Sequence, residues 1–224
     1  MYGKVKLTKR QIKEDKFTTF MLTAKHQFIE NWQWFVIGIA AVILVIVAVI
    51  YYLNSQEASR QEANERLSRA LLDFRAGSHE VTILSLADII DDYPGTAVAD
   101  QATFLLARLN YELRNYPEAQ RYFEMYVETY EGNDLRRASS LGGIAACYEN
   151  LGNYTEAARR FAVAVDEYPD GPLAGDYRLA AMRNFLIAGE IEPARTQMEA
   201  IRRNFAGTEL ERNAIKLFNE KSRI

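Results

Sequence analysis

Twenty consecutive residues without a charged side chain, 34–53, divide the sequence. At about 1.5 Å per residue, a helix of this length spans about 30 Å, the thickness of the hydrocarbon core of a bilayer. The run is too long and begins too late for a cleaved signal peptide, and a buried core helix fits it poorly. The sequence therefore predicts one transmembrane helix, with its flanking aromatic residues at the membrane–water boundaries: Trp32, Trp34, Tyr51 and Tyr52.

The charges before and after this helix differ in sign. Residues 1–33 contain seven basic and three acidic side chains; because the whole chain carries −3, residues 54–224 carry −7. An excess of Lys and Arg favours the cytoplasmic side of a membrane. We therefore predict a cytoplasmic basic segment, 1–33, a transmembrane helix, 34–53, and an exported domain, 54–224. In a bacterium the protein would lie in the inner membrane with its C-terminal domain in the periplasm; the opposite orientation is the alternative.

Residues 1–33 also show the pattern of an amphipathic helix. Thr8 and Gln11 have the spacing of a capping box, so a helix should begin near Lys9. Lysines flank its apolar face and can contact anionic lipid head groups. The helix either lies on the membrane or docks onto a membrane or cytosolic partner. Its apolar stripe comprises Phe17, Phe20, Met21, Ala24 and Phe28.

The exported part contains a repeat of 37 to 38 residues. Turn landmarks recur at spacings of 37, 38 and 37 residues, at Gly77, Arg114, Gly152 and Gly189. Amphipathic segments with helical periodicity lie before and after each landmark. The period therefore predicts an all-α fold, in which about four helical hairpins stack as an α-solenoid. The charged stretch 208–224 should form a capping helix.

The unit 138–169 resembles the tetratricopeptide repeat, with an alanine in the place usually held by glycine. The residues that carry this resemblance, and that should mark the contacts between the two helices and the exit of the unit, are Ala145, Tyr148, Gly152, Ala157, Phe161 and Pro169. The resemblance implies a right-handed superhelix, and the first helix of each repeat of such a solenoid should line a concave groove. Side chains expected in that groove are Arg75, Phe104, Arg108, Tyr111, Glu149, Asn150 and Arg183. Aromatic and arginine side chains suit a bound peptide, although several of these residues could instead pack against a neighbouring helix.

The sequence lacks the motifs of catalysis. One cysteine, Cys147, and two histidines, His26 and His79, cannot form a zinc site, and no phosphate-binding loop or nucleophile elbow is present. A net charge of −3 argues against nucleic-acid binding. We therefore expect a non-enzymatic protein with protein partners, no cofactor, no metal and no small-molecule substrate.

The order of segments resembles the YfgM-type proteins, ancillary subunits of the bacterial SecYEG translocon. The basic stretch 6–11, the single anchor helix and the exported repeats carry this resemblance. It implies an adaptor that binds the translocon, a periplasmic chaperone or exported polypeptides. The alternative is a permanent structural or assembly subunit of a larger membrane complex. A partner of outer-membrane or cell-division assembly is a third possibility.

Overall fold

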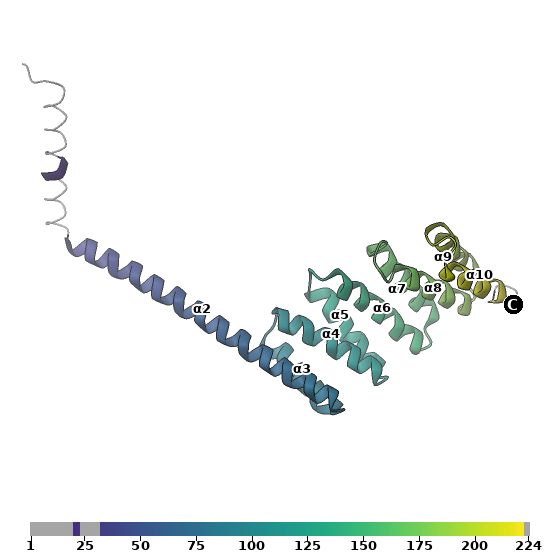
Figure 1. Ribbon diagram of the computed structural model, residues 1–224, viewed down its shortest axis with the longest axis horizontal. Coiled ribbons are helices and arrows are strands. Elements are labelled where there is room, and N and C mark those ends of the chain that lie inside the picture. The colour runs from purple at the N-terminus through teal and green to yellow at the C-terminus, as the bar shows by residue number, and fades with distance from the viewer. Residues whose placement is uncertain (1–19, 23–31, 222–224) are drawn as a thin grey trace, which may run out of the picture. The chain divides into compact units, whose positions relative to one another are not determined.

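The computed structural model describes residues 20–22 and 32–221 of the chain (Figure 1). The predicted start of a helix near Lys9 and most of the predicted apolar stripe lie outside these residues, whereas Phe20 and Met21 are helical and exposed. All regular structure in the described part is helical, which confirms the all-α prediction. The chain divides into two compact units, residues 1–59 and 60–224.

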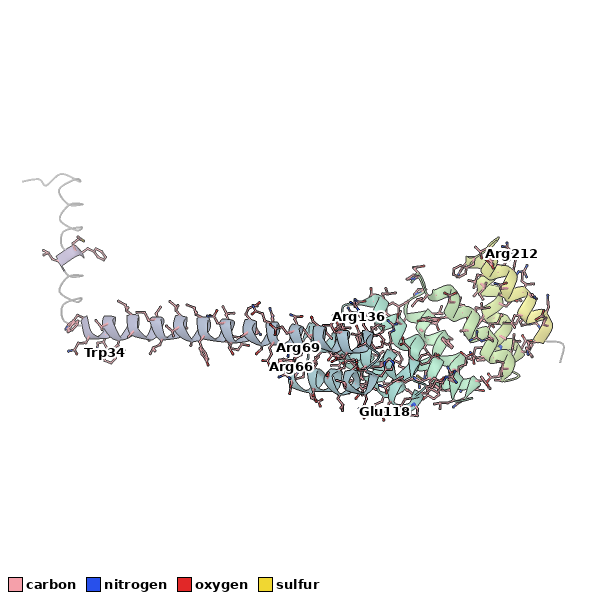
Figure 2. The ribbon with its side chains drawn as sticks, turned by 60° about the horizontal axis from the view of Figure 1, so that its bottom comes forward. Trp34, Arg66, Arg69, Glu118, Arg136 and Arg212 are labelled. Carbon is pink, nitrogen blue, oxygen red and sulfur yellow. The ribbon has the colours of Figure 1, made fainter. Side chains whose placement is uncertain are left out.

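Helix α2, Trp32–Arg75, contains the apolar run of the first unit. It has 44 residues, and its most apolar window of 18 residues has a mean hydropathy of 3.0, so its length and composition suit a membrane span. None of the side chains described in this run is buried, and the four flanking aromatic residues, among them Trp34 in Figure 2, are also exposed. The helix continues without interruption past Ser59, so its last residues belong to the second unit.

The second unit is a stack of four helical hairpins followed by one more helix (Figure 1). The end of α2 pairs with α3, His79–Asp92. The next hairpins are α4 with α5, α6 with α7, and α8 with α9, and α10 follows. Their bounds are Ala97–Glu112, Tyr116–Thr129, Asp134–Asn150, Tyr154–Glu167, Ala174–Ile187, Ile191–Asn204 and Glu209–Lys221. The predicted four hairpins and final helix are therefore confirmed.

The four turn landmarks share one backbone geometry. Gly77, Arg114, Gly152 and Gly189 have φ angles of 79°, 62°, 81° and 79°. In each turn the next residue donates its N–H to the carbonyl five residues earlier, at 2.8 to 2.9 Å. This is the Schellman arrangement, which ends a helix with one residue in the left-handed region. The 37-to-38-residue period thus repeats a turn that ends the first helix of every hairpin.

Glycines allow helix α6 to approach two of its neighbours closely. A Cβ atom added to Gly143 would lie 2.6 Å from Cε2 of Phe123 in α5, and one added to Gly142 would overlap the ring of Tyr177 in α8. Both contacts would be shorter than an ordinary carbon–carbon contact of about 3.5 Å. The aromatic rings therefore occupy the space that a side chain on α6 would otherwise fill.

The two ends of the hairpin stack are protected from solvent in different ways. On α2, Glu65 and Arg69 form an exposed ion pair at 3.3 Å (Figure 2 labels Arg69). The equivalent positions on α4, 37 residues later, are Ala102 and Leu106, which are fully buried. The outer side of α2 is therefore polar at positions where α4 is apolar. At the other end α10 covers α8 and α9 with apolar residues, including the buried Phe218, as the end of a solenoid requires.

Candidate protein-binding surface

The first helices of the hairpins carry the side chains that were expected to line a groove. We use the name inner face for the surface formed by Arg108, Tyr111 and Glu112 of α4, Glu149 and Asn150 of α6, and Arg183 of α8. All six side chains are exposed or half-buried. They come from three successive hairpins, so the surface depends on the stacking of the repeats.

Polar contacts between side chains link the three helices of the inner face. Asn150 donates its Nδ2–H to the hydroxyl oxygen of Tyr111 at 3.0 Å, which joins α6 to α4. Arg183 donates to both carboxylate oxygens of Glu149 at 2.7 and 2.9 Å, which joins α8 to α6. Such two-pronged contacts of an arginine with a carboxylate fix geometry as well as charge. Burial raises the pKa of Tyr111 above the ordinary value for a tyrosine.

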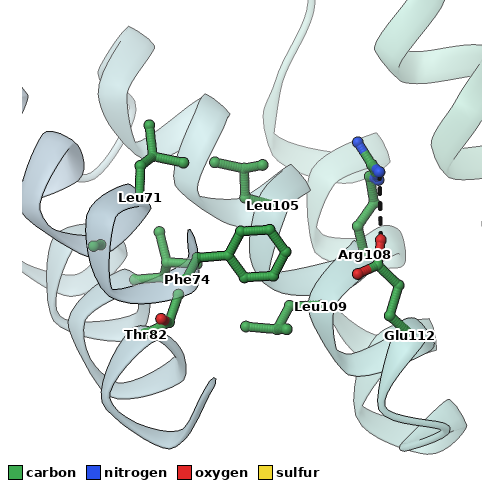
Figure 3. A pocket seen from close by; sticks show the side chains of 9 residues that line it. Leu71, Phe74, Thr82, Leu105, Arg108, Leu109 and Glu112 are labelled. Atoms are coloured by element: carbon green, nitrogen blue, oxygen red, sulfur yellow. Dashed lines mark hydrogen bonds and ion pairs between the residues drawn. The ribbon is translucent and has the colours of Figure 1, made fainter. Parts of the chain in front are cut away.

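A pocket opens beside Arg108, between α2, α3 and α4 (Figure 3). Its cavity volume is about 60 Å³, and it is partly open to solvent. Arg108 and Glu112 lie along one side of it and form an ion pair at 3.4 Å, which is the dashed line in Figure 3. Its other walls are formed by Ala70, Leu71, Phe74, Thr82, Leu86, Leu105 and Leu109. An apolar cavity with a charged rim suits an apolar side chain of a bound protein segment.

The other two residues expected in the groove, Phe104 and Arg75, differ in their exposure. Phe104 is half-buried, and its ring centroid lies 5.6 Å from that of Tyr126 and 6.4 Å from that of Phe123, both on α5. It therefore packs inside the second hairpin. Arg75 is exposed at the C-terminal end of α2.

The residues expected within the third repeat occupy distinct environments. Ala145 and Ala157 are fully buried and Phe161 is only 4% exposed, so these three belong to the core. Tyr148 is half-buried, Gly152 lies in the turn, and Pro169 is exposed after α7. The small residues on facing helices let them pack closely, and the aromatic ring fills the space between hairpins.

Leu105 and Leu109 of the pocket do not appear among the groove residues expected from the sequence. They flank Arg108 on α4, four residues apart, so both lie on the same side of the helix. Extending the stripe that contains Arg108 toward its neighbours would have indicated them.

In the part of the chain that the structure describes, no three residues among His, Cys, Asp and Glu gather as a metal ion would require. Cys147 is fully buried, and burial raises the pKa of its thiol to about 12, so it stays protonated and unreactive.

The stacked hairpins have the same turn geometry, and three of them together form the inner face. These features define the chain as a helical-repeat protein. A family model described as a tetratricopeptide repeat-like domain matches residues 25–168, and the chain belongs to this family. Proteins with such repeats are typically non-enzymatic adaptors for other proteins. No curated protein matches the sequence.

Solved structures share the fold at low sequence identity. A tetratricopeptide repeat protein from Parabacteroides merdae superposes with a TM-score of 0.62 at 13% identity, over 73% of this chain and 61% of that one. This chain thus covers less than two thirds of that protein. The repeats of a putative kinesin light chain from Podosopora anserina give 0.55 at 14% identity, over 71% and 84%. The tetratricopeptide repeat protein YrrB gives 0.51 at 14%, over 70% and 76%.

Proposed function

We propose that this protein is a membrane-anchored, non-enzymatic adaptor of the YfgM type. Its exported repeats bind segments of other proteins at the outer face of the bacterial inner membrane. The observation that carries this proposal is the apolar pocket beside Arg108, in a chain of the tetratricopeptide repeat-like family.

The contacts on the inner face suggest how a segment is held. Tyr111 with Asn150, and Glu149 with Arg183, already satisfy one another, so they form a fixed wall. Arg108 and Glu112 are about half exposed and their ion pair is long, so both can turn to a ligand at little cost. An apolar side chain of the segment enters the pocket, while Arg108 and Glu112 bind its polar groups. YrrB, which shares this fold, is described as having an unusual peptide-binding site.

The anchor restricts which proteins the repeats meet. The uncharged run 34–53 suits a membrane span, and the basic residues before it favour a cytoplasmic N-terminus. Binding partners on the outer side are then the translocon, periplasmic chaperones and polypeptides in transit. Because the native Cys147 is buried, a single new cysteine in place of Glu220 can report the orientation. A membrane-impermeant maleimide should label it in spheroplasts; labelling only after lysis would contradict the orientation.

Purification of the full chain through a C-terminal tag in mild detergent tests the adaptor function. We expect substoichiometric translocon or chaperone, lost in the Arg108→Glu variant and retained in Arg121→Glu. Arg121 lies on α5, does not line the pocket, is similarly exposed and also pairs with a glutamate on its own helix, so it is a matched control. Stoichiometric subunits that copurify with both variants would instead identify a permanent component of a membrane complex.

A further inference from the structure

Helix α3 differs from the other second helices of the hairpins on its solvent side. Val81 and Leu84 of α3 are 52% and 62% exposed. The equivalent positions of α5, 37 residues later, are Glu118 and Arg121, which form an ion pair at 2.8 Å (Figure 2 labels Glu118). In α7 the equivalent residues are again charged, Glu156 and Arg159. At the same positions α9 has Pro193 and Thr196. Two of the other three second helices therefore carry charged residues where α3 exposes two apolar side chains.

The carboxylates of α3 are also not balanced by basic residues on the same helix. It has four carboxylates and no lysine or arginine, whereas α5, α7 and α9 contain one, two and three arginines. Asp92 pairs with Arg66 of α2 at 2.6 Å. Glu80, Asp88 and Asp91 are exposed and form no ion pair with other residues that the structure describes.

The exposed apolar and acidic residues lie on the same side of α3. At 100° per residue, Leu84, Asp88 and Asp91 lie opposite the buried Leu86 and Ile89. We use the name α3 outer face for Glu80, Val81, Leu84, Asp88 and Asp91. The pocket beside Arg108 uses Thr82 and Leu86, which point the other way. The two surfaces are therefore separate.

We propose that the α3 outer face binds a cationic amphipathic helix of a partner protein. Apolar residues spaced three or four apart on such a helix can cover Val81 and Leu84, and its lysines or arginines can reach the three unpaired carboxylates. A second copy of α3 would place like charges against each other, and anionic lipid head groups would be repelled. This proposal goes beyond the adaptor function of the inner face and depends on different residues.

The test uses the full chain in nanodiscs of zwitterionic lipid, with empty nanodiscs as the blank. The probe is a fluorescent synthetic helix of about 20 residues, long enough to fold on binding, with leucines on one side and lysines on the other. We expect the Val81→Glu/Leu84→Arg variant, which installs the charged pair of α5, to weaken binding at least about tenfold without lowering the melting temperature. Added salt should weaken binding to the unaltered protein.

Two controls keep the test specific. The Asp166→Asn/Glu167→Gln variant removes two exposed carboxylates from α7 and should leave binding unchanged. A probe with glutamates in place of lysines should not bind. Equal affinity of the Val81→Glu/Leu84→Arg variant, an equal loss in the α7 variant, or binding of the acidic probe would overturn the proposal. None of these outcomes affects the role of the pocket on the inner face.

Discussion

The substitution Gly143→Ala tests the close approach of α5 and α6. The new Cβ atom would lie 2.6 Å from Cε2 of Phe123, so the ring has to move by about 0.9 Å to reach an ordinary contact. Phe123 is only 4% exposed and has little room to move. Overpacking of this kind costs about 1 to 3 kcal/mol, whereas alanine in a helix is favoured over glycine by about 1 kcal/mol. We expect the overlap to dominate, with a net loss of about 1 kcal/mol.

The sign of this effect should reverse when the ring is removed. In a Phe123→Ala background the new methyl group meets no aromatic ring, and only the helix preference of alanine remains. Gly143→Ala should then raise the free energy of unfolding by about 0.5 to 1 kcal/mol. The two substitutions should therefore couple by about 1.5 to 2 kcal/mol, as expected for residues in direct contact.

Urea denaturation of the four proteins, followed by helical circular dichroism in the same mild detergent, measures this coupling. The unaltered chain, both single variants and the double variant complete the thermodynamic cycle. Additive effects of Gly143→Ala and Phe123→Ala would refute the close approach of these two helices.

Four further predictions concern the turns, the core, the inner face and pH. Arg114→Gly should raise the free energy of unfolding by about 1 kcal/mol because φ is 62° there; a lower melting temperature would contradict the turn geometry. Phe161 is only 4% exposed, so Phe161→Ala should lower the free energy of unfolding by about 3 to 5 kcal/mol in urea denaturation. A loss below about 1 kcal/mol would be inconsistent with its burial. Glu149→Gln should lower the free energy of unfolding by less than about 1 kcal/mol, because Arg183 is 43% exposed and solvent weakens its ion pair with Glu149. A larger loss in urea denaturation would argue against that exposure. Burial raises the pKa of Tyr177 to about 12, so its contribution to stability is complete below about pH 10 and is lost as the pH rises toward 12. The Tyr177→Phe variant has no such group to ionise, so the midpoint of its alkaline unfolding, measured by circular dichroism, should lie at higher pH. An unchanged midpoint would contradict this.

The hairpins could be predicted because their signals are local. Each helix shows its own periodicity, and the turn residues at Gly77, Gly152 and Gly189 are the type that a left-handed backbone favours. Arg114 was found only through the spacing, since nothing in arginine itself favours that conformation. The final helix, predicted within 208–224, lies at Glu209–Lys221 because α10 carries an apolar side that covers the stack.

The contact partner of each side chain on the inner face could not be predicted in the same way. Tyr111 and Asn150 are 39 residues apart, and Glu149 and Arg183 are 34 apart, so their pairing depends on how neighbouring hairpins are rotated. That rotation is set by close contacts such as Gly143 with the ring of Phe123. The same packing turns Phe104 toward α5. Periodicity identifies the side of a helix but not the neighbour that covers it.

Site-specific photocrosslinking in intact cells tests the adaptor function most directly. A photoreactive amino acid replaces Arg108 at the rim of the pocket or, as a control, Arg121 on α5. We expect translocon, chaperone or newly exported polypeptides to crosslink at position 108 and not at position 121. Absence of crosslinks at position 108, or the same products at both positions, would contradict the binding of protein segments on the inner face.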